Sequence, residues 1–250
     1  LLCLNSPQNP TGTAFSPETL RGICELVLAE NAARERRDER PLYVMYDQVY
    51  WMLCFGGTVH VTPPALLPEM TRYTIFVDGI SKAFAATGVR VGWGVGPADV
   101  IARMTTLLAH MGAWAPRAEQ VGTVALLDDS QAIRAFHATF LRGLQARLDR
   151  LHAGLQALKA EGLPVDSIAP TGAIYLTACI HPFGRTTPEG VRLETNEQVR
   201  QYLLQAARVA AVPVKAFGSK EEDGWLRLSE GAVSDQDLAE ALPGLAAALR

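Results

Sequence analysis

Cysteine is scarce in this sequence, and its few copies are too scattered to form a recognisable site. The four cysteines include no C-x-x-C pair, and none of the five histidines stands at metal-ligand spacing. The pattern therefore predicts neither a disulfide framework nor a metal site. Unpaired cysteines are typical of a reducing compartment, so we expect a cytoplasmic protein whose histidines are structural or at the surface.

Long apolar runs and a surplus of positive charge are also lacking. No run approaches the ~18–20 residues of a membrane span, and the N-terminus lacks the layout of a signal peptide. Lys plus Arg is 23 against 26 for Asp plus Glu, a net charge of −3, whereas binding nucleic acid needs a basic surplus. We therefore expect neither nucleic acid nor membrane as a partner. The 250 residues are 48% hydrophobic, which is enough for a large core.

Strand-like and helix-like segments alternate through the first part of the chain, which predicts a sheet with helices on both faces. Ser16-Pro17 has the form of a helix start, and the charged stretch 34–40 is expected to be a solvated helix end. The expected strands end in polar or glycine-rich residues, which is typical of the sheet edge at which α/β proteins bind their ligands. Strands are expected at 1–4, 42–46, 73–77 and 89–95, and helices from 16, at 97–111, at 117–127 and at 130–161.

The last hundred residues have a different, α+β pattern. Strands are expected at 173–180, 212–217 and 225–229, and helices open at the capping box Thr195-x-x-Gln198 and at Ser234-x-x-Asp237. The long helix at 130–161 could bridge two domains. We therefore predict a boundary inside it, giving a large domain at 1–147 and a smaller C-terminal domain at 148–250.

The most specific motif runs from Gly79 to Trp93. Lys82 stands among small and apolar residues, with no acidic neighbour after Asp78. Such surroundings favour a neutral, nucleophilic amine suited to a Schiff base. Ser81 could donate to a phosphate, and Arg90, between two glycines, could fork onto it. A surface loop is the weaker interpretation, because surface loops rarely surround a charge with Ala, Phe, Val and Trp.

The glycines that follow this lysine form the pattern Gly92-x-Gly94-x-Gly96. It resembles a dinucleotide motif only superficially, because it lies on an expected strand and lacks the strand-turn-helix context. We interpret it as close packing between neighbouring strands.

A carboxylate and a phenol follow the second expected strand, in Asp47-Gln48-Val49-Tyr50. They could address a protonated ring nitrogen and a phenolate oxygen of one planar ligand, and a hydrogen bond to a charged group is worth roughly 1.5–3 kcal/mol. The alternative is that Asp47 caps the next segment while Tyr50 packs beside Trp51. For an isolated motif of this kind, the alternative is favoured.

A proline-rich turn, Asn5 to Gly12, follows the first expected strand. Its two prolines fix the path of the chain and could hold the Asn9 amide toward the sheet edge. An ordinary strand-to-helix turn explains the segment equally well.

These three motifs, in this order, resemble the class I/II aminotransferases, the pyridoxal-phosphate enzymes of fold type I. The resemblance covers nearly the whole chain. It implies an α/β fold: a three-layer, mostly parallel sheet in a large domain that is incomplete at the N-terminus, with a smaller C-terminal α+β domain. It further implies that Lys82 forms the Schiff base with pyridoxal 5′-phosphate and moves the substrate proton.

The same resemblance implies the remaining site residues. It places Asp47 on the pyridinium nitrogen, Asn9 and Tyr50 on the ring O3′, and Ser81 and Arg90 on the phosphate. The segment 225–229 resembles the strand that offers an arginine, here Arg227, to the substrate α-carboxylate. A solvated strand charge is the weaker interpretation of Arg227, because its neighbours are Trp and Leu.

The sequence also departs from the family. Asp78 and Val89 stand where Asn and often Trp are usual, and Gln48 stands where Glu is common; we expect none of them to touch the chemistry. The chain begins at Leu1, inside an apolar strand-like run. We therefore expect residues to be missing upstream, among them a phosphate-binding loop and a ring-stacking aromatic, and expect the chain alone to bind cofactor poorly.

The function implied is transfer of an amino group from an L-amino acid to a 2-oxo acid by a homodimer. Two alternatives stay open. Another fold type I enzyme, such as a C–S lyase, would share Lys82, Asp47 and Arg90. A transcription regulator with an aminotransferase-like effector domain would carry its DNA-binding part upstream.

Overall fold

The computed structural model describes residues 1–250, which divide into two compact units. Unit 1 comprises Leu1–Pro7 and Ala14–Thr139, and unit 2 comprises Gln8–Thr13 and Phe140–Arg250. Helix α6 (Ser130–Ala160) belongs to both. The domain boundary expected near residue 147 lies in this same helix and stays a prediction. Nothing in the sequence indicated that the turn at 8–13 would join the second unit.

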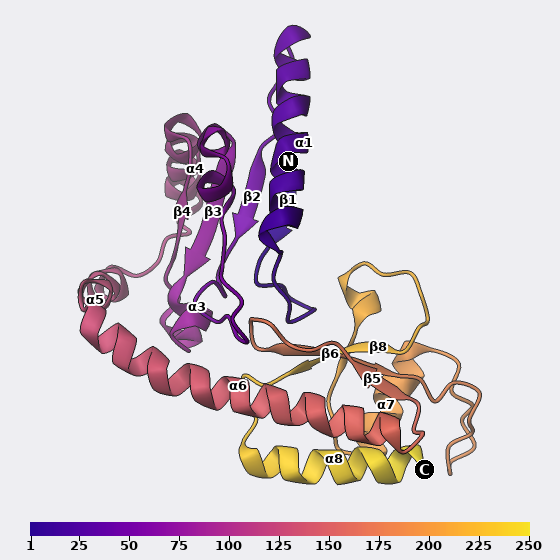
Figure 1. The fold of residues 1–250 in the computed structure, drawn as a ribbon. Helices are drawn as coiled ribbons and strands as arrows, with labels where there is room; N and C mark the ends of the chain where they lie inside the picture. Colours follow the sequence, from indigo (N-terminus) through magenta and orange to yellow (C-terminus); the bar gives the residue numbers. More distant parts are fainter. The chain divides into compact units, whose positions relative to one another are not determined.

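Unit 1 contains a four-stranded sheet in the order β1-β2-β3-β4 (Figure 1). The first three strands are parallel, and β4 is antiparallel to β3. The carboxyl ends of β1, β2 and β3 therefore meet at one edge, whereas β4 ends at the opposite edge. The expectation that all these strands end at one working edge is thus wrong for the last of them. The strands are β1 (Leu2–Asn5), β2 (Val44–Asp47), β3 (Thr74–Gly79) and β4 (Gly92–Val95).

The principal helix of unit 1 begins where the sequence predicts it. The Ser16 side chain accepts a hydrogen bond from the Thr19 N–H at 3.1 Å and so caps α1 (Pro17–Arg36). Leu20, Cys24 and Val27 recur at helical spacing and are buried against β2 in the core. The other helices are α2 (Pro63–Leu66), α3 (Ile80–Ala83), α4 (Ala98–Met111) and α5 (Arg117–Asp128), with 3₁₀ turns η1 (Pro68–Arg72) and η2 (Thr87–Val89).

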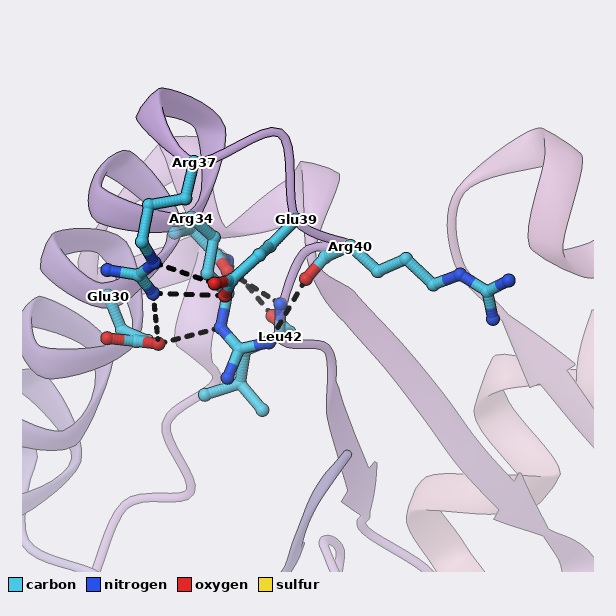
Figure 2. Close-up of polar contacts among 7 residues, drawn as sticks. Glu30, Arg34, Arg37, Glu39, Arg40 and Leu42 are labelled. Atoms are coloured by element: carbon cyan, nitrogen blue, oxygen red, sulfur yellow. Dashed lines mark hydrogen bonds and ion pairs between the residues drawn. The ribbon is translucent and has the colours of Figure 1, made fainter.

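The charged end of α1 is held by ion pairs at the protein surface (Figure 2). Glu30 accepts from Arg34 Nε at 2.7 Å, and Glu39 accepts from Arg37 Nε at 2.8 Å. Arg34 Nη1 also donates to the Arg40 carbonyl oxygen at 3.2 Å. Exposed pairs of this kind contribute little stability individually, but here they link the helix end to the segment that leads into β2.

Unit 2 contains a second four-stranded sheet, in the order β5-β6-β8-β7, with every pairing antiparallel. The strand expected at 212–217 pairs for only two residues, because the chain then turns into the 3₁₀ helix η3 (Val214–Phe217), which ends at Gly218 with φ of 106°. Strand β5 was not foreseen. The strands are β5 (Val165–Ser167), β6 (Tyr175–Ile180), β7 (Val212–Pro213) and β8 (Trp225–Ser229).

Both helices expected from capping signals in unit 2 are confirmed. Thr195 Oγ1 accepts from the Gln198 N–H at 3.2 Å, and the Gln198 side chain accepts from the Thr195 N–H at 3.1 Å at the start of α7 (Asn196–Ala206). Ser234 and Asp237 form the same reciprocal pair at the start of α8 (Asp235–Leu249). None of the helices combines the length and hydropathy that a membrane span requires.

Candidate functional site

The seven residues singled out in the sequence fall into two groups. Asp47, Tyr50, Ser81, Lys82 and Arg90 belong to unit 1, whereas Asn9 and Arg227 belong to unit 2. Each group is described within its own unit.

Asp47 is the last residue of β2, at the edge where the parallel strands end. Its carbonyl oxygen accepts from Asn5 Nδ2 and from the Ser6 N–H, both at 3.0 Å, which ties the ends of β1 and β2 together. Its carboxylate Oδ1 accepts from the Val49 N–H at 3.1 Å, so Asp47 does cap the following turn. This capping bond engages one of the two carboxylate oxygens. Tyr50, on the same turn, is 4% exposed.

Lys82 lies on the single-turn helix α3, directly after β3. The turn needs glycine on both sides, because a Cβ on Gly79 would come within 2.9 Å of the Val91 oxygen, and one on Gly92 within 2.9 Å of the Asp78 oxygen. Close approach of β3 and β4 therefore explains Gly92, as the packing interpretation predicts. Lys82 itself is half-buried.

Thr87 joins the two residues expected to hold phosphate, and the sequence analysis missed it. Thr87 Oγ1 donates to the Ser81 carbonyl oxygen at 2.9 Å, and Arg90 Nη1 donates to the Thr87 carbonyl oxygen at 2.7 Å. Arg90 is exposed and has φ of 62°. One guanidinium nitrogen of Arg90 is thus engaged by the loop. The sequence offered one signal for Thr87, which is the position of its hydroxyl between alanine and glycine residues of the loop.

A partly buried polar cluster that the sequence did not indicate lies next to Asp47 and α3. Gln48 Nε2 donates to Asp78 Oδ2 at 3.3 Å, and the Gly79 N–H donates to Asp78 Oδ1 at 2.7 Å. Gln48 Oε1 lies 3.3 Å from His60 Nε2. Two of the departures from the family pattern, Gln48 and Asp78, are therefore bonded to each other.

Burial changes the proton affinity of both ends of this cluster. It raises the pKa of Asp78, which is 8% exposed, and the nearby negative charge of Asp47 adds to that rise against opposing hydrogen bonds. Burial lowers the pKa of His60 to about 4, so His60 is neutral at pH 7. The expectation that Asp78 is remote from the chemistry did not allow for its electrostatic interaction with Asp47.

In unit 2, Arg227 and Asn9 are hydrogen bonded. Arg227 Nη1 donates to Asn9 Oδ1 at 2.8 Å. The guanidinium carbon lies 4.6 Å from the Tyr175 ring centroid and 4.9 Å from that of Phe217, so two aromatic rings flank the charge. Arg227 Nε is buried and has no hydrogen-bond partner. One hydrogen bond and two aromatic rings thus fix the position of the Arg227 guanidinium within unit 2.

The turn that carries Asn9 is anchored on the unit 2 sheet. Thr177 Oγ1 donates to the Pro10 carbonyl oxygen at 3.2 Å, and the Gly12 carbonyl oxygen accepts from the Thr171 and Gly172 N–H groups at 2.8 and 3.0 Å. Gly12 has φ of 70°, a backbone conformation in which glycine is strongly favoured. The segment is therefore more than a connecting turn, because these bonds hold Asn9 beside Arg227.

The unit 1 residues combine an amine, a carboxylate at a neighbouring strand end, and a hydroxyl and guanidinium on one loop. Unit 2 separately holds an arginine that is hydrogen bonded to an amide. The unit 1 groups are of the kinds that can bind an anionic planar ligand, and the unit 2 arginine is of the kind that can bind a carboxylate. No group of three or more His, Cys, Asp or Glu side chains is placed to hold a metal ion.

Comparison with known sequences identifies relatives along the whole chain. The family model for aminotransferase class I and II matches residues 1–245. An aspartate aminotransferase of Rhizobium meliloti (strain 1021) is 34% identical over 98% of this chain and 55% of its own length. A probable aspartate/prephenate aminotransferase of Thermus aquaticus is 32% identical over 100% of this chain and 56% of its own. The chain thus spans little more than half the length of these curated relatives.

Solved structures show the same relationship. The aspartate aminotransferase of Rhizobium meliloti matches with a TM-score of 0.84 and 31% identity, over 99% of this chain and 57% of that one. An aromatic aminotransferase of Pyrococcus horikoshii OT3 matches with a TM-score of 0.80 and 27% identity, over 99% and 59%. The predicted fold class is confirmed, and the chain belongs to the class I and II aminotransferase family.

Proposed function

We propose that the intact protein is a pyridoxal-phosphate-dependent aminotransferase that moves an amino group from an L-amino acid to a 2-oxo acid. The observation that carries the proposal is the position of Lys82. It follows β3 on a single helical turn, at the edge where the adjacent parallel strand β2 ends in Asp47. An amine and a carboxylate at neighbouring strand ends are what an acid/base reaction on a protonated heterocycle needs.

The donor set supports pyridoxal 5′-phosphate as the cofactor. Asp47 keeps one carboxylate oxygen for a ring nitrogen, and its charge favours the protonated form of that nitrogen. Arg90 and Ser81, joined through Thr87, supply a cation and a hydroxyl for a phosphate. The family resemblance assigns the amide of Asn9 and the phenol of Tyr50 to the phenolate oxygen of the cofactor.

When bound, this cofactor supplies an electron sink for charge that develops at the substrate Cα. The residues of the chain do the remaining work. Lys82 Nζ accepts the proton from Cα and returns it, acting as general base and then general acid. Asp47 holds a proton on the ring nitrogen throughout.

Arg227 accounts for the substrate class. A guanidinium flanked by Tyr175 and Phe217 loses water around its charge, which strengthens its attraction for a carboxylate. Nη1 donates to Asn9, and the guanidinium is only partly buried. Its exposed part can pair with an α-carboxylate, a group common to all L-amino acids and 2-oxo acids.

We further propose that the intact protein is a cytoplasmic homodimer with small-molecule substrates and neither nucleic acid nor membrane as a partner. The net charge of −3 supports the part of this proposal that concerns nucleic acid, the dispersed cysteines support a reducing compartment, and the homodimer rests on the family resemblance.

The decisive experiment is borohydride trapping of the intact protein with added pyridoxal 5′-phosphate, followed by peptide mapping. We expect one labelled residue, Lys82, and loss of the visible absorbance in Lys82→Ala. Lys220→Ala, which removes an exposed lysine, is the matched control and should keep both signals. Labelling at another lysine would overturn the proposal.

Product analysis then identifies the reaction. An aminotransferase requires a 2-oxo acid and produces a new amino acid. Release of pyruvate and ammonia without a 2-oxo acid would indicate a lyase instead. Cofactor binding without any turnover, together with a DNA-binding segment upstream, would indicate the effector part of a regulator.

A further inference from the structure

The partly buried cluster of Gln48, Asp78 and His60 has no part in the proposed reaction. Gln48 follows Asp47 directly, and its backbone N–H donates to the Val77 carbonyl oxygen at 3.0 Å. Asp78 is the penultimate residue of β3, and its Oδ1 accepts from the N–H of Gly79, the residue that precedes α3. The cluster therefore touches the backbone on both sides of the proposed site, at Asp47 and at the entrance to the Lys82 turn.

The hydrogen bonds in the cluster have one consistent direction. His60 Nδ1 is buried and has no partner, so a proton there would be an unsatisfied donor. The proton of the neutral ring consequently belongs on Nε2, which donates to Gln48 Oε1 at 3.3 Å. With its oxygen facing His60, Gln48 presents Nε2 to Asp78 Oδ2. The orientation of the histidine thus sets that of the amide.

Asp78 receives donors and offers none. Gln48 Nε2, the Gly79 N–H and the Trp51 side chain all donate to its carboxylate, the pattern of an ionised group. The charged group that faces it is Asp47, on the neighbouring strand end. Asp78 is thus a second carboxylate beside Asp47, and it lies buried four residues before Lys82.

We propose that His60, Gln48 and Asp78 are positioning residues, a directional hydrogen-bond chain that orients the ends of β2 and β3 and holds a second carboxylate beside Asp47 and the Lys82 turn. This inference rests on the proposed function for its electrostatic part. An ionised carboxylate at this place would favour the protonated form of a cofactor bound beside Asp47 and Lys82. The rival explanation is a polar cluster that stabilises the fold and nothing more.

A charge swap separates the two explanations. Asp78→Asn places an amide NH₂ against the donors that surround Asp78, and Gln48→Glu places a second carboxylate against Asp78. Each single variant should therefore lower the unfolding midpoint of the intact apoprotein. The double variant Gln48→Glu/Asp78→Asn restores donor-to-acceptor pairing with the charge moved to residue 48, and its midpoint should return close to wild type. If the unfolding midpoint of the double variant falls by as much as the two single variants' decreases add up to, the hydrogen-bond chain is refuted.

The second readout is the pH midpoint of the visible absorbance of the cofactor-loaded protein. Asp78→Asn should move this midpoint to lower pH, and the swap should move it back toward wild type. Asp99→Asn is the matched control, because it removes an equal charge that is exposed after β4, at the opposite sheet edge. If Asp78→Asn behaves like Asp99→Asn, the electrostatic role is wrong and the cluster is structural only.

Failure of the proposed function is distinguishable from failure of this inference. Without a cofactor on Lys82, no visible band forms in any variant, whereas the unfolding midpoints of the apoprotein still report whether Gln48 and Asp78 are coupled.

Discussion

His60 should make the protein lose stability at mildly acidic pH. Burial lowers the pKa of His60 from 6.5 to about 4 in the folded state. Between these values the unfolded chain binds a proton at this side chain and the folded protein does not. The stabilising contribution is therefore complete above about pH 6.5 and is lost progressively as the pH falls toward 4.

The difference of roughly 2.5 pH units corresponds to about 3 kcal/mol at about 1.4 kcal/mol per unit. His60 is only partly buried, and solvent screening reduces this to about 1–2 kcal/mol. His60→Gln keeps an N–H for the Gln48 oxygen but cannot titrate. We expect the variant to lose less stability than wild type between pH 7 and pH 5.

The measurement is urea unfolding of the intact apoprotein, followed by tryptophan fluorescence at both pH values. Trp51 is a suitable probe, because its ring centroid lies 6.3 Å from that of His60. His181→Gln, at an exposed position, is the control and should show the pH dependence of wild type. If His60→Gln loses as much stability on acidification as wild type, His60 is not the group that titrates.

Three further predictions concern other parts of the chain. Gly92→Ala should destabilise the protein by about 1–3 kcal/mol in urea unfolding, because its Cβ meets the Asp78 oxygen at 2.9 Å, whereas Gly22→Ala on α1 has open space and should be neutral or stabilising; equal effects would contradict the close approach. Thr195→Ala should cost about 1 kcal/mol in thermal unfolding through loss of the capping box, and Thr195→Ser should cost much less. Arg227→Lys should lower kcat/KM for an L-amino acid roughly 10- to 100-fold, and an unchanged value would remove Arg227 from the substrate site.

Local patterns in the sequence were sufficient wherever the structure depends on neighbours along the chain. The caps at Ser16, Thr195 and Ser234 lie where hydroxyl residues precede helical periodicity, because a cap satisfies N–H groups only two or three residues away. The strand ending in Asp47 was likewise readable from its apolar run. The long helix α6 followed from a stripe of regularly spaced apolar residues.

Patterns of this kind were less informative about strands whose pairing is not local. The antiparallel direction of β4, the short pairing of β7 and the existence of β5 depend on which partner each strand meets. A strand of three residues, such as Val165–Ser167, is stabilised by its neighbour in the sheet more than by its own sequence.

The sequence alone was sufficient to identify the family and the chemical candidates, because a lysine, a carboxylate and an arginine in a particular order carry that information without coordinates. Only the tertiary structure revealed the Gln48–Asp78–His60 chain, the bond between Arg227 and Asn9, and the role of Thr87 between Ser81 and Arg90. Gln48 and Asp78 are 30 residues apart, and Arg227 and Asn9 are 218 apart. Hydrogen bonds over such separations depend on how the sheets bring strand ends together, and no local pattern encodes them.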